Sequence, residues 1–172
     1  MRSQSMECYV LRMSLMLVLL LAGCAGKPSE QADLLFTQMI GPIFDGTLLL
    51  HTDRERYTHD DWVAVLLENQ TGGTVYFPDQ SFGVQGFRYN ESTGHWDPYS
   101  LGFGVGNPVR KRIEPDARPI EQGFYQFPTD RMVFDGAKAI RIRLLVIGYS
   151  LPLERGGGQR RGAYVDIEVT AR

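Results

Sequence analysis

Strict alternation of apolar and charged residues is the most constraining feature of this 172-residue chain. From residue 140 to 146, Ile, Ile, Leu and Val occupy every second position, and Arg141 and Arg143 lie between them. In the segment 165–169, β-branched residues alternate with Asp and Glu in the same way. Successive side chains of a strand point to opposite faces, so this period of two predicts half-buried antiparallel strands. We therefore expect Arg141 and Arg143 on a solvent-facing surface.

Short apolar segments separated by turn residues make up most of the remaining chain. The further expected strands are residues 46–52, 62–69, 74–77, 82–89, 95–99, 109–113 and 123–127. About seven to nine short strands, with turn signals roughly every eight to twelve residues, predict an all-β fold. The expected architecture is an antiparallel immunoglobulin-like β-sandwich, with a small β-barrel as the alternative. Trp62 and Trp96 are expected to pack in the core or at its edge.

A mostly apolar segment near the N-terminus precedes this expected domain. Residues 13–22 follow Arg2 and Arg12, which provide a positively charged flank. The segment matches the length of a secretory signal and is shorter than the ~20 residues that a membrane-spanning helix needs. We therefore expect residues 1–23 to be a cleaved signal peptide. The alternatives are an uncleaved N-terminal anchor and an ordinary buried segment.

The apolar segment ends in Leu21-Ala22-Gly23-Cys24, which resembles the lipobox of bacterial lipoproteins. The resemblance implies diacylglycerol on the Cys24 sulfur, cleavage before Cys24 and acylation of the new N-terminus. About two or three acyl chains anchor a protein stably to a membrane. Ala25 resembles the residues that let lipoproteins proceed to an outer membrane. We expect a lipid-anchored protein at the cell membrane or outer membrane, facing the periplasm or the exterior. The expected organisation is a signal peptide over 1–23, a lipidated tether over 24–42 and a β-sandwich over 43–172.

The composition of the expected domain excludes several classes of stabilisation and function. Cys8 leaves with the signal and Cys24 carries lipid, so neither disulfides nor cysteine-ligated metal are expected. The formal net charge of −2 gives no reason to expect a nucleic-acid partner. Residues 34–39 are expected to form at most one or two helical turns before Gly41-Pro42.

A second resemblance concerns the segment from Val63 to Trp96. Its elements are a strand ending in Asn69, then Thr71, the strands 75–77 and 87–89, and Gly94 two residues before Trp96. This layout resembles the immunoglobulin-like domain of the BsuPI intracellular proteinase inhibitor group. The resemblance implies the fold and, as an alternative function, a proteinase inhibitor-like domain at the cell surface.

Candidate catalytic and metal-binding patterns lack the spacing that their chemistry needs. His51, His59, Asp60 and Asp61 offer ligand groups, but not at a zinc-site spacing. The glycine-rich segment 102–106 is followed by a proline and a strand-like sequence, where a phosphate loop would open a helix. We therefore expect no enzymatic activity, no catalytic residues, no metal and no cofactor. A hydrolase with a site assembled from distant residues is the remaining alternative.

The segment 154–161, ERGGGQRR, is the expected contact region. Loops at the end of a sandwich are held by the sheets, and the guanidinium groups of Arg155, Arg160 and Arg161 suit phosphate or carboxylate. The alternative is a disordered hairpin loop that its charge keeps soluble. The sequence favours a non-catalytic binding or structural module that contacts the membrane through Cys24 and a protein or envelope polymer through its loops.

Overall fold

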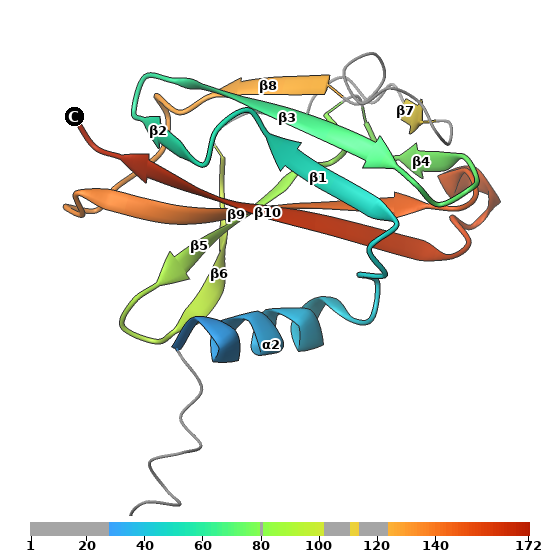
Figure 1. Cartoon of the computed structure of the whole chain (residues 1–172), viewed down its shortest axis with the longest axis horizontal. Coiled ribbons are helices and arrows are strands. Elements are labelled where there is room, and N and C mark those ends of the chain that lie inside the picture. The colour runs from blue at the N-terminus through green and yellow to red at the C-terminus, as the bar shows by residue number, and fades with distance from the viewer. Residues whose placement is uncertain (1–27, 80, 102–110, 114–123) are drawn as a thin grey trace, which may run out of the picture.

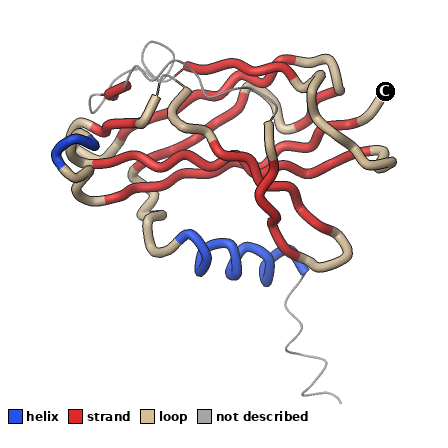
Figure 2. The backbone as a smooth tube through the Cα atoms, turned by 180° about the vertical axis from the view of Figure 1, so that it is seen from behind, coloured by secondary structure: helices blue, strands red, loops and turns tan. Residues whose placement is uncertain are grey.

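The computed structural model describes residues 28–79, 81–101, 111–113 and 124–172. These residues form ten strands, the helix α2 (Pro28–Ile40) and the short 3-10 turn η1 (Leu153–Arg155). The strands are β1 (Leu48–Thr52), β2 (Arg56–Thr58), β3 (Trp62–Asn69), β4 (Val75–Phe77), β5 (Gln85–Asn90), β6 (His95–Tyr99), β7 (Lys111–Ile113), β8 (Phe124–Pro128), β9 (Ala139–Tyr149) and β10 (Arg160–Thr170). They are arranged in two packed layers with α2 on one outer side (Figures 1 and 2).

The two sheets differ in size and share an antiparallel plan. The smaller sheet has the order β1-β3-β8, and the larger follows β2-β10-β9-β4-β7. The β5–β6 hairpin joins the larger sheet through β5, which pairs with β9. Among the described strands, only β2 and β10 pair in parallel. The prediction of an antiparallel, immunoglobulin-like β-sandwich is confirmed, and the three-residue strand β2 is an addition to it.

The main core lies between the two sheets. The inner face of β9 contributes the alternating residues Ile140 to Val146, and β3 contributes Val63 and Val65 from the opposite sheet. All of these side chains are buried, as the period of two predicted. β5 begins later than expected, at Gln85, because Phe82 and Gly83 both have φ of 60° and form a turn.

Helix α2 covers the outer face of the larger sheet (Figure 1). Its buried stripe follows a spacing of four residues: Ala32 is 1% exposed, Phe36 is 2% exposed, and Ile40 packs against the same cluster. The helix ends at Gly41, whose φ of 93° is left-handed and whose N–H donates to the Thr37 carbonyl at 2.9 Å. The helix thus adds a second, smaller core outside the sandwich.

The expectation of a tether over residues 24–42 is wrong for Pro28–Ile40, which fold onto the domain as a helix. The helix is also longer than the one or two turns expected, although it ends before Gly41-Pro42 as predicted. Leu34 and Met39 are exposed, at 59% and 55%, so two of the large apolar residues of this segment lie outside its packing face. None of the helices in the described part of the chain is long and apolar enough to cross a membrane.

The expected solvent-facing position of Arg143 is also wrong, because its side chain is 1% exposed. Helix α2 and the aromatic residues beside it cover this part of the outer face, so β9 is buried on both sides here. Arg141, two residues earlier on the same face, is only half-buried. The two arginines of the alternating pattern therefore have different surroundings.

Candidate functional site

Arg143 joins three elements of the fold through two ion pairs. Its Nε and Nη2 donate to the two carboxylate oxygens of Asp166, each at 2.7 Å, and Nη2 also donates to Oδ1 of Asp33 at 2.7 Å. Asp166 lies directly opposite on β10, and Asp33 comes from α2. Desolvation by burial opposes the charge, but these hydrogen bonds outweigh it and raise the pKa of Arg143 above its ordinary value.

Aromatic rings enclose the same guanidinium group. Its central carbon lies 4.1 Å from the ring centroids of Trp96 and Tyr164, and 4.8 Å from that of Phe36. Two buried donors, Arg143 Nη1 and Trp96 Nε1, have no hydrogen-bond acceptor among the described residues. Because the charge is paired and covered on several sides, we assign Arg143 a structural role that fixes α2 to the sheet.

A groove of about 610 Å³ opens between the β5–β6 hairpin and the start of β9, next to the last β5–β9 pair, Arg88 with Ile142. Its lining comes from the β5–β6 hairpin, the segment 135–139, the start of β9 and the end of β10. The charged or polar side chains that matter below are Arg88, Glu91, Asp97, Tyr99, Asp135 and Arg141. Since these elements meet only in the folded sheet, the groove joins residues that are far apart in the sequence.

Arg141 lies in the groove above an aromatic surface. Its guanidinium carbon is 4.5 Å from the ring centroid of Tyr89 and 5.6 Å from that of Trp96. Glu168 is its register partner on β10, but the Glu168 carboxylate pairs with Nε of Arg56 at 3.6 Å. No acceptor among the described residues takes a hydrogen bond from the Arg141 guanidinium, which has five N–H donors. Arg141 is thus positioned by stacking and its donors remain available.

The walls of the groove are held by hydrogen bonds between distant segments. Nη1 of Arg88 donates to Asp135 at 2.6 Å and to the Val133 carbonyl at 3.2 Å, and Nη2 donates to the Phe134 carbonyl at 3.1 Å. The Tyr99 hydroxyl accepts from the Val133 N–H at 2.7 Å and donates to its carbonyl at 3.2 Å. These contacts fix the segment before β9 against the hairpin, so the groove is pre-formed.

Acidic groups also line the groove. Asp97 accepts a hydrogen bond from Nδ2 of Asn90 at 2.9 Å, and the side-chain Oδ1 of Asn90 accepts from the Ser92 N–H at 3.1 Å within the hairpin turn. Asp97 and Glu91 are exposed, and the described residues provide no basic partner for either. Asp135 and Glu168 are paired with Arg88 and Arg56, as given above. The groove lining therefore includes one positive charge without an acidic partner, on Arg141, and two negative charges without a basic partner, on Glu91 and Asp97, among the described residues.

The predicted contact residues Arg155, Arg160 and Arg161 do not converge. Arg155 is exposed in η1, and Arg160 and Arg161 are consecutive on β10, so their side chains point to opposite faces. Nη1 of Arg161 pairs with Asp45 and donates to Oγ1 of Thr47 at 2.9 Å. A hydrogen bond from Thr47 and, more weakly, the charge of Arg161 lower the pKa of Asp45 against the effect of desolvation.

The loop that carries these arginines is an ordered turn. The Leu151 N–H donates to the Gly157 carbonyl at 3.0 Å, and the Gly157 N–H donates to the Pro152 carbonyl at 3.2 Å. Gly156, Gly157 and Gly158 all have positive φ, of 85°, 71° and 66°, which explains the three consecutive glycines. The disordered alternative for this loop is therefore wrong.

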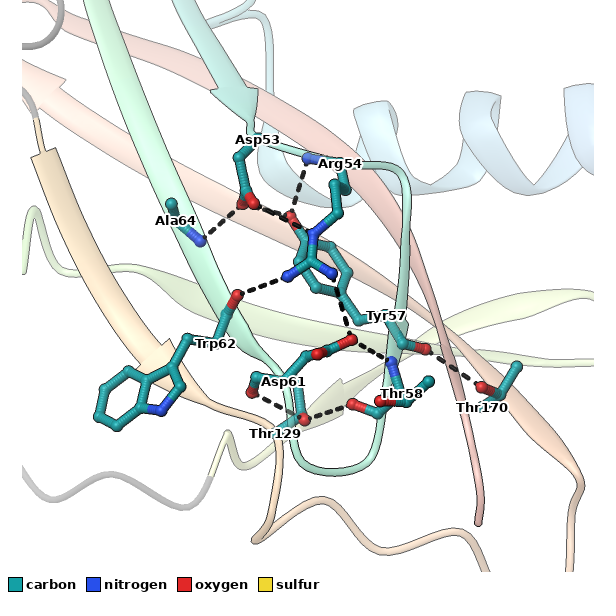
Figure 3. Close-up of polar contacts among 9 residues, drawn as sticks. All are labelled: Asp53, Arg54, Tyr57, Thr58, Asp61, Trp62, Ala64, Thr129 and Thr170. Carbon is teal, nitrogen blue, oxygen red and sulfur yellow. Dashed lines mark hydrogen bonds and ion pairs between the residues drawn. The ribbon is translucent and has the colours of Figure 1, made fainter.

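A polar network closes the corner between β1 and β3 (Figure 3). The Tyr57 hydroxyl donates to Oδ1 of Asp53 at 2.7 Å and accepts from the Arg54 N–H at 3.1 Å, while the same Asp53 oxygen accepts from the Ala64 N–H at 2.9 Å. Burial, and then the hydrogen bond to Asp53, raise the pKa of Tyr57 to about 12. A hydrogen bond from the Thr58 backbone lowers the pKa of Asp61. Near sequence neighbours make most of these contacts, so we assign the network to the stability of the corner.

The remaining sequence candidates have simple placements. Trp96 is buried, whereas Trp62 is 56% exposed at the start of β3 and does not pack as expected (Figure 3). His51 lies 3.7 Å from Glu68, and His59 lies 3.5 Å from Asp60. Within the described ranges, no three His, Cys, Asp or Glu side chains gather as a metal site would require. Cys24 and the segment 102–106 lie outside the described residues.

Comparisons with known proteins do not identify a family or a function for this chain. No protein-family model matches this chain, and no curated protein matches it. Among solved structures, the sulfur carrier protein SoxY from Chlorobium limicola f thiosulfatophilum is similar over 81% of this chain and 94% of that chain. The two are 12% identical, and the TM-score is 0.31, so this similarity carries no argument about function.

Proposed function

We propose that this protein is a lipid-anchored, non-catalytic binding module of the cell envelope, with the groove beside Arg141 as its contact site. The observation that carries the proposal is Arg141, which is stacked on Tyr89 in a pre-formed groove and has no acceptor among the described residues. A half-buried guanidinium with unused donors suits recognition of an anionic group on a partner. This site replaces the loop 154–161 as the favoured contact region.

The anchor would keep this groove close to the membrane. Pro28, the first residue of α2, follows the lipobox Cys24 by only four positions, which is a reach of about 14 Å at most. The beginning of α2 lies beside the turn of the β5–β6 hairpin, which forms one wall of the groove (Figures 1 and 2). A short connection to a packed helix favours a module that meets its partner at the membrane surface, where anchoring raises the local concentration.

Lipidation is tested by changing the acceptor. A Cys24→Ala variant produced in the native host should incorporate no labelled fatty acid and should leave the membrane fraction. A control variant, Ser92→Ala on the hairpin turn, should keep both label and location. Label that persists on Cys24→Ala would contradict the anchor.

The contact site is tested by crosslinking in intact cells. A photo-reactive amino acid replaces Ser92, which is exposed at the rim of the groove, and in a matched control it replaces the exposed Arg155. These positions lie at opposite ends of the β9–β10 pair. The proposal predicts a discrete adduct from position 92 and none from 155. An adduct from 155 alone would return the site to the predicted loop.

Proteinase inhibition is the second candidate, and the rigid β9–β10 turn is the observation that favours it. Leu151 is 46% exposed there, on a loop that backbone hydrogen bonds hold in shape. Inhibition of a secreted proteinase at micromolar protein that disappears in a Leu151→Ala variant would favour this candidate. Absence of inhibition across a panel of proteinases would exclude it.

A further inference from the structure

We infer that the groove binds a peptide carboxylate at Arg141 and a basic group of the same peptide at Glu91 and Asp97. This inference rests on the proposed function, because it names the chemical class of ligand for the same groove. It comes from the opposite charges in the lining of the groove, where Arg141 lacks an acidic partner and Glu91 and Asp97 lack a basic one among the described residues.

The guanidinium group of Arg141 fits one carboxylate. Stacking at 4.5 Å on Tyr89 covers a face of the Arg141 guanidinium and leaves its N–H edge, which matches the two oxygens of a carboxylate. The nearest basic neighbour in the groove, Arg88, is already paired with Asp135 at 2.6 Å and with two carbonyls. A single unpaired guanidinium balances a monoanion.

The carboxylates of Glu91 and Asp97 select among anionic ligands. Asp97 and Glu91 are acidic, exposed and without a basic partner in the described part of the chain. A phosphate dianion or a polymer of uronic acids would meet these carboxylates as like charges. A peptide that carries both a carboxylate and an ammonium group places opposite charges at both positions, so the groove favours a peptide over an acidic polysaccharide.

Trp96 offers a direct optical reading of this binding. Its ring lies 5.6 Å from the Arg141 guanidinium, and the chain has two tryptophans, the other being the exposed Trp62. In a Trp62→Phe background, the emission of the full-length protein in detergent micelles reports Trp96 alone. The probe is a tetrapeptide with an N-terminal lysine and a free C-terminal carboxylate, and its C-terminal amide is the matched control.

The free-acid peptide should change the Trp96 emission saturably, and the amide should bind about tenfold more weakly or worse. Arg141→Gln should weaken binding of the acid by a similar factor and leave binding of the amide unchanged. Arg141→Lys should bind the acid more tightly than Arg141→Gln does and less tightly than the unchanged protein. Lysine keeps the positive charge but lacks the planar pair of N–H donors that matches a carboxylate. Arg160→Gln, an exposed arginine outside the groove, should change nothing.

The contact between the peptide's basic group and Glu91 is tested by a separate variant. Glu91→Gln should weaken binding of the lysine peptide. It should not change binding of a peptide that has alanine in place of lysine. Equal affinity for acid and amide, unchanged binding by Arg141→Gln, or tighter binding of oligouronate or inorganic phosphate would overturn the inference. Native emission and circular dichroism of each variant without peptide establish that it is folded.

The outcome separates this inference from the proposed function. If the position-92 crosslink forms in cells but the peptide titrations fail, the module is retained and the ligand class is wrong. If the peptide binds but Cys24→Ala stays on the membrane, the ligand class is retained and the anchor is wrong.

Discussion

Arg141 and Arg143 lie two residues apart on the same face of β9, yet their environments differ in every respect that matters for function. Arg143 is 1% exposed, has two carboxylate partners and is enclosed by three aromatic rings. Arg141 is half-buried, contacts two rings and has no acceptor among the described residues. Trp96 contacts both guanidinium groups and marks the boundary between the covered and open parts of this face.

The element that covers each arginine, and not the strand pattern, therefore decides what that arginine does. Under α2, a charge is desolvated and must be paired, so Arg143 costs stability unless Asp166 and Asp33 stay in place. Beyond α2, water solvates the donors of Arg141, so the fold does not depend on pairing them. One arginine holds the helix, and the other is available to a ligand.

The largest expected effect comes from removing the buried arginine. Arg143→Ala should lower the free energy of unfolding by about 3 kcal/mol, because it leaves two carboxylates unpaired and a cavity among aromatic rings. Arg141→Ala, the matched control, should cost about 1 kcal/mol or less, since only solvated stacking is lost. Urea unfolding followed by circular dichroism, in a common Cys24→Ser background, measures both. Equal losses of unfolding free energy in Arg143→Ala and Arg141→Ala would contradict the structural role assigned to Arg143.

Loosening the helix should separate the two regions further. Phe36→Ala removes a ring that is 2% exposed and should destabilise the docking of α2 by about 2 kcal/mol, less than a fully enclosed core site because the helix can detach. Hydrogen exchange should then rise in Pro28–Ile40 and remain low in β3. Leu34→Ala, on the exposed side of the same helix, should leave exchange unchanged. Unchanged exchange in Phe36→Ala would mean that α2 does not depend on this contact.

A smaller effect should follow from removing the charge of Asp33, the helix carboxylate that contacts Arg143. Asp33→Asn should cost about 1 kcal/mol, because Asp33 is partly solvated and Asp166 keeps both of its bonds to Arg143. Glu30→Gln, at an exposed position of the same helix, is the control. A loss as large as that of Arg143→Ala would show that the helix contact, and not the strand contact, dominates this cluster.

The smallest effect concerns Tyr57, a buried polar group. Its partners are close in the sequence, unlike those of Arg143. Folding raises the pKa of Tyr57 to about 12, so the neutral phenol is favoured in the folded state. Its contribution to stability should be present below pH ~10 and should disappear as the pH rises through about 12. An alkaline titration of tyrosinate absorbance should show a late step that Tyr57→Phe removes. Ionisation of Tyr57 at the ordinary value would contradict the corner network.

The sequence predicts the inner face of the sandwich well and its outer face poorly. Alternation in 140–146 identifies the core side of β9, because the period of two depends only on the strand itself. What covers the other side depends on contacts such as Arg143 with Asp33, which are 110 residues apart. The helix had a usable signal, because Ala32, Phe36 and Ile40 recur at intervals of four between Pro28 and Gly41. The exposed Leu34 and Met39 obscured it.

The candidate site was missed for the same reason. Arg141 and Arg143 are indistinguishable in the alternating pattern, and the groove needs the hairpin, the segment before β9 and β10 together. The sequence favours the loop 154–161 because it holds three arginines, although Arg161 pairs with Asp45 and Arg160 points to the other face. Local composition indicates charge, whereas its availability depends on tertiary contacts.

Crosslinking from position 92 in intact cells, repeated in Arg141→Gln and Arg143→Gln backgrounds, tests the division between the two arginines most directly. We expect Arg141→Gln to abolish the adduct at an unchanged level of folded protein. Arg143→Gln should instead lower the amount of folded protein, while the molecules that remain folded still form the adduct. An adduct that persists in Arg141→Gln would contradict the central claim that this arginine is the contact residue of the groove.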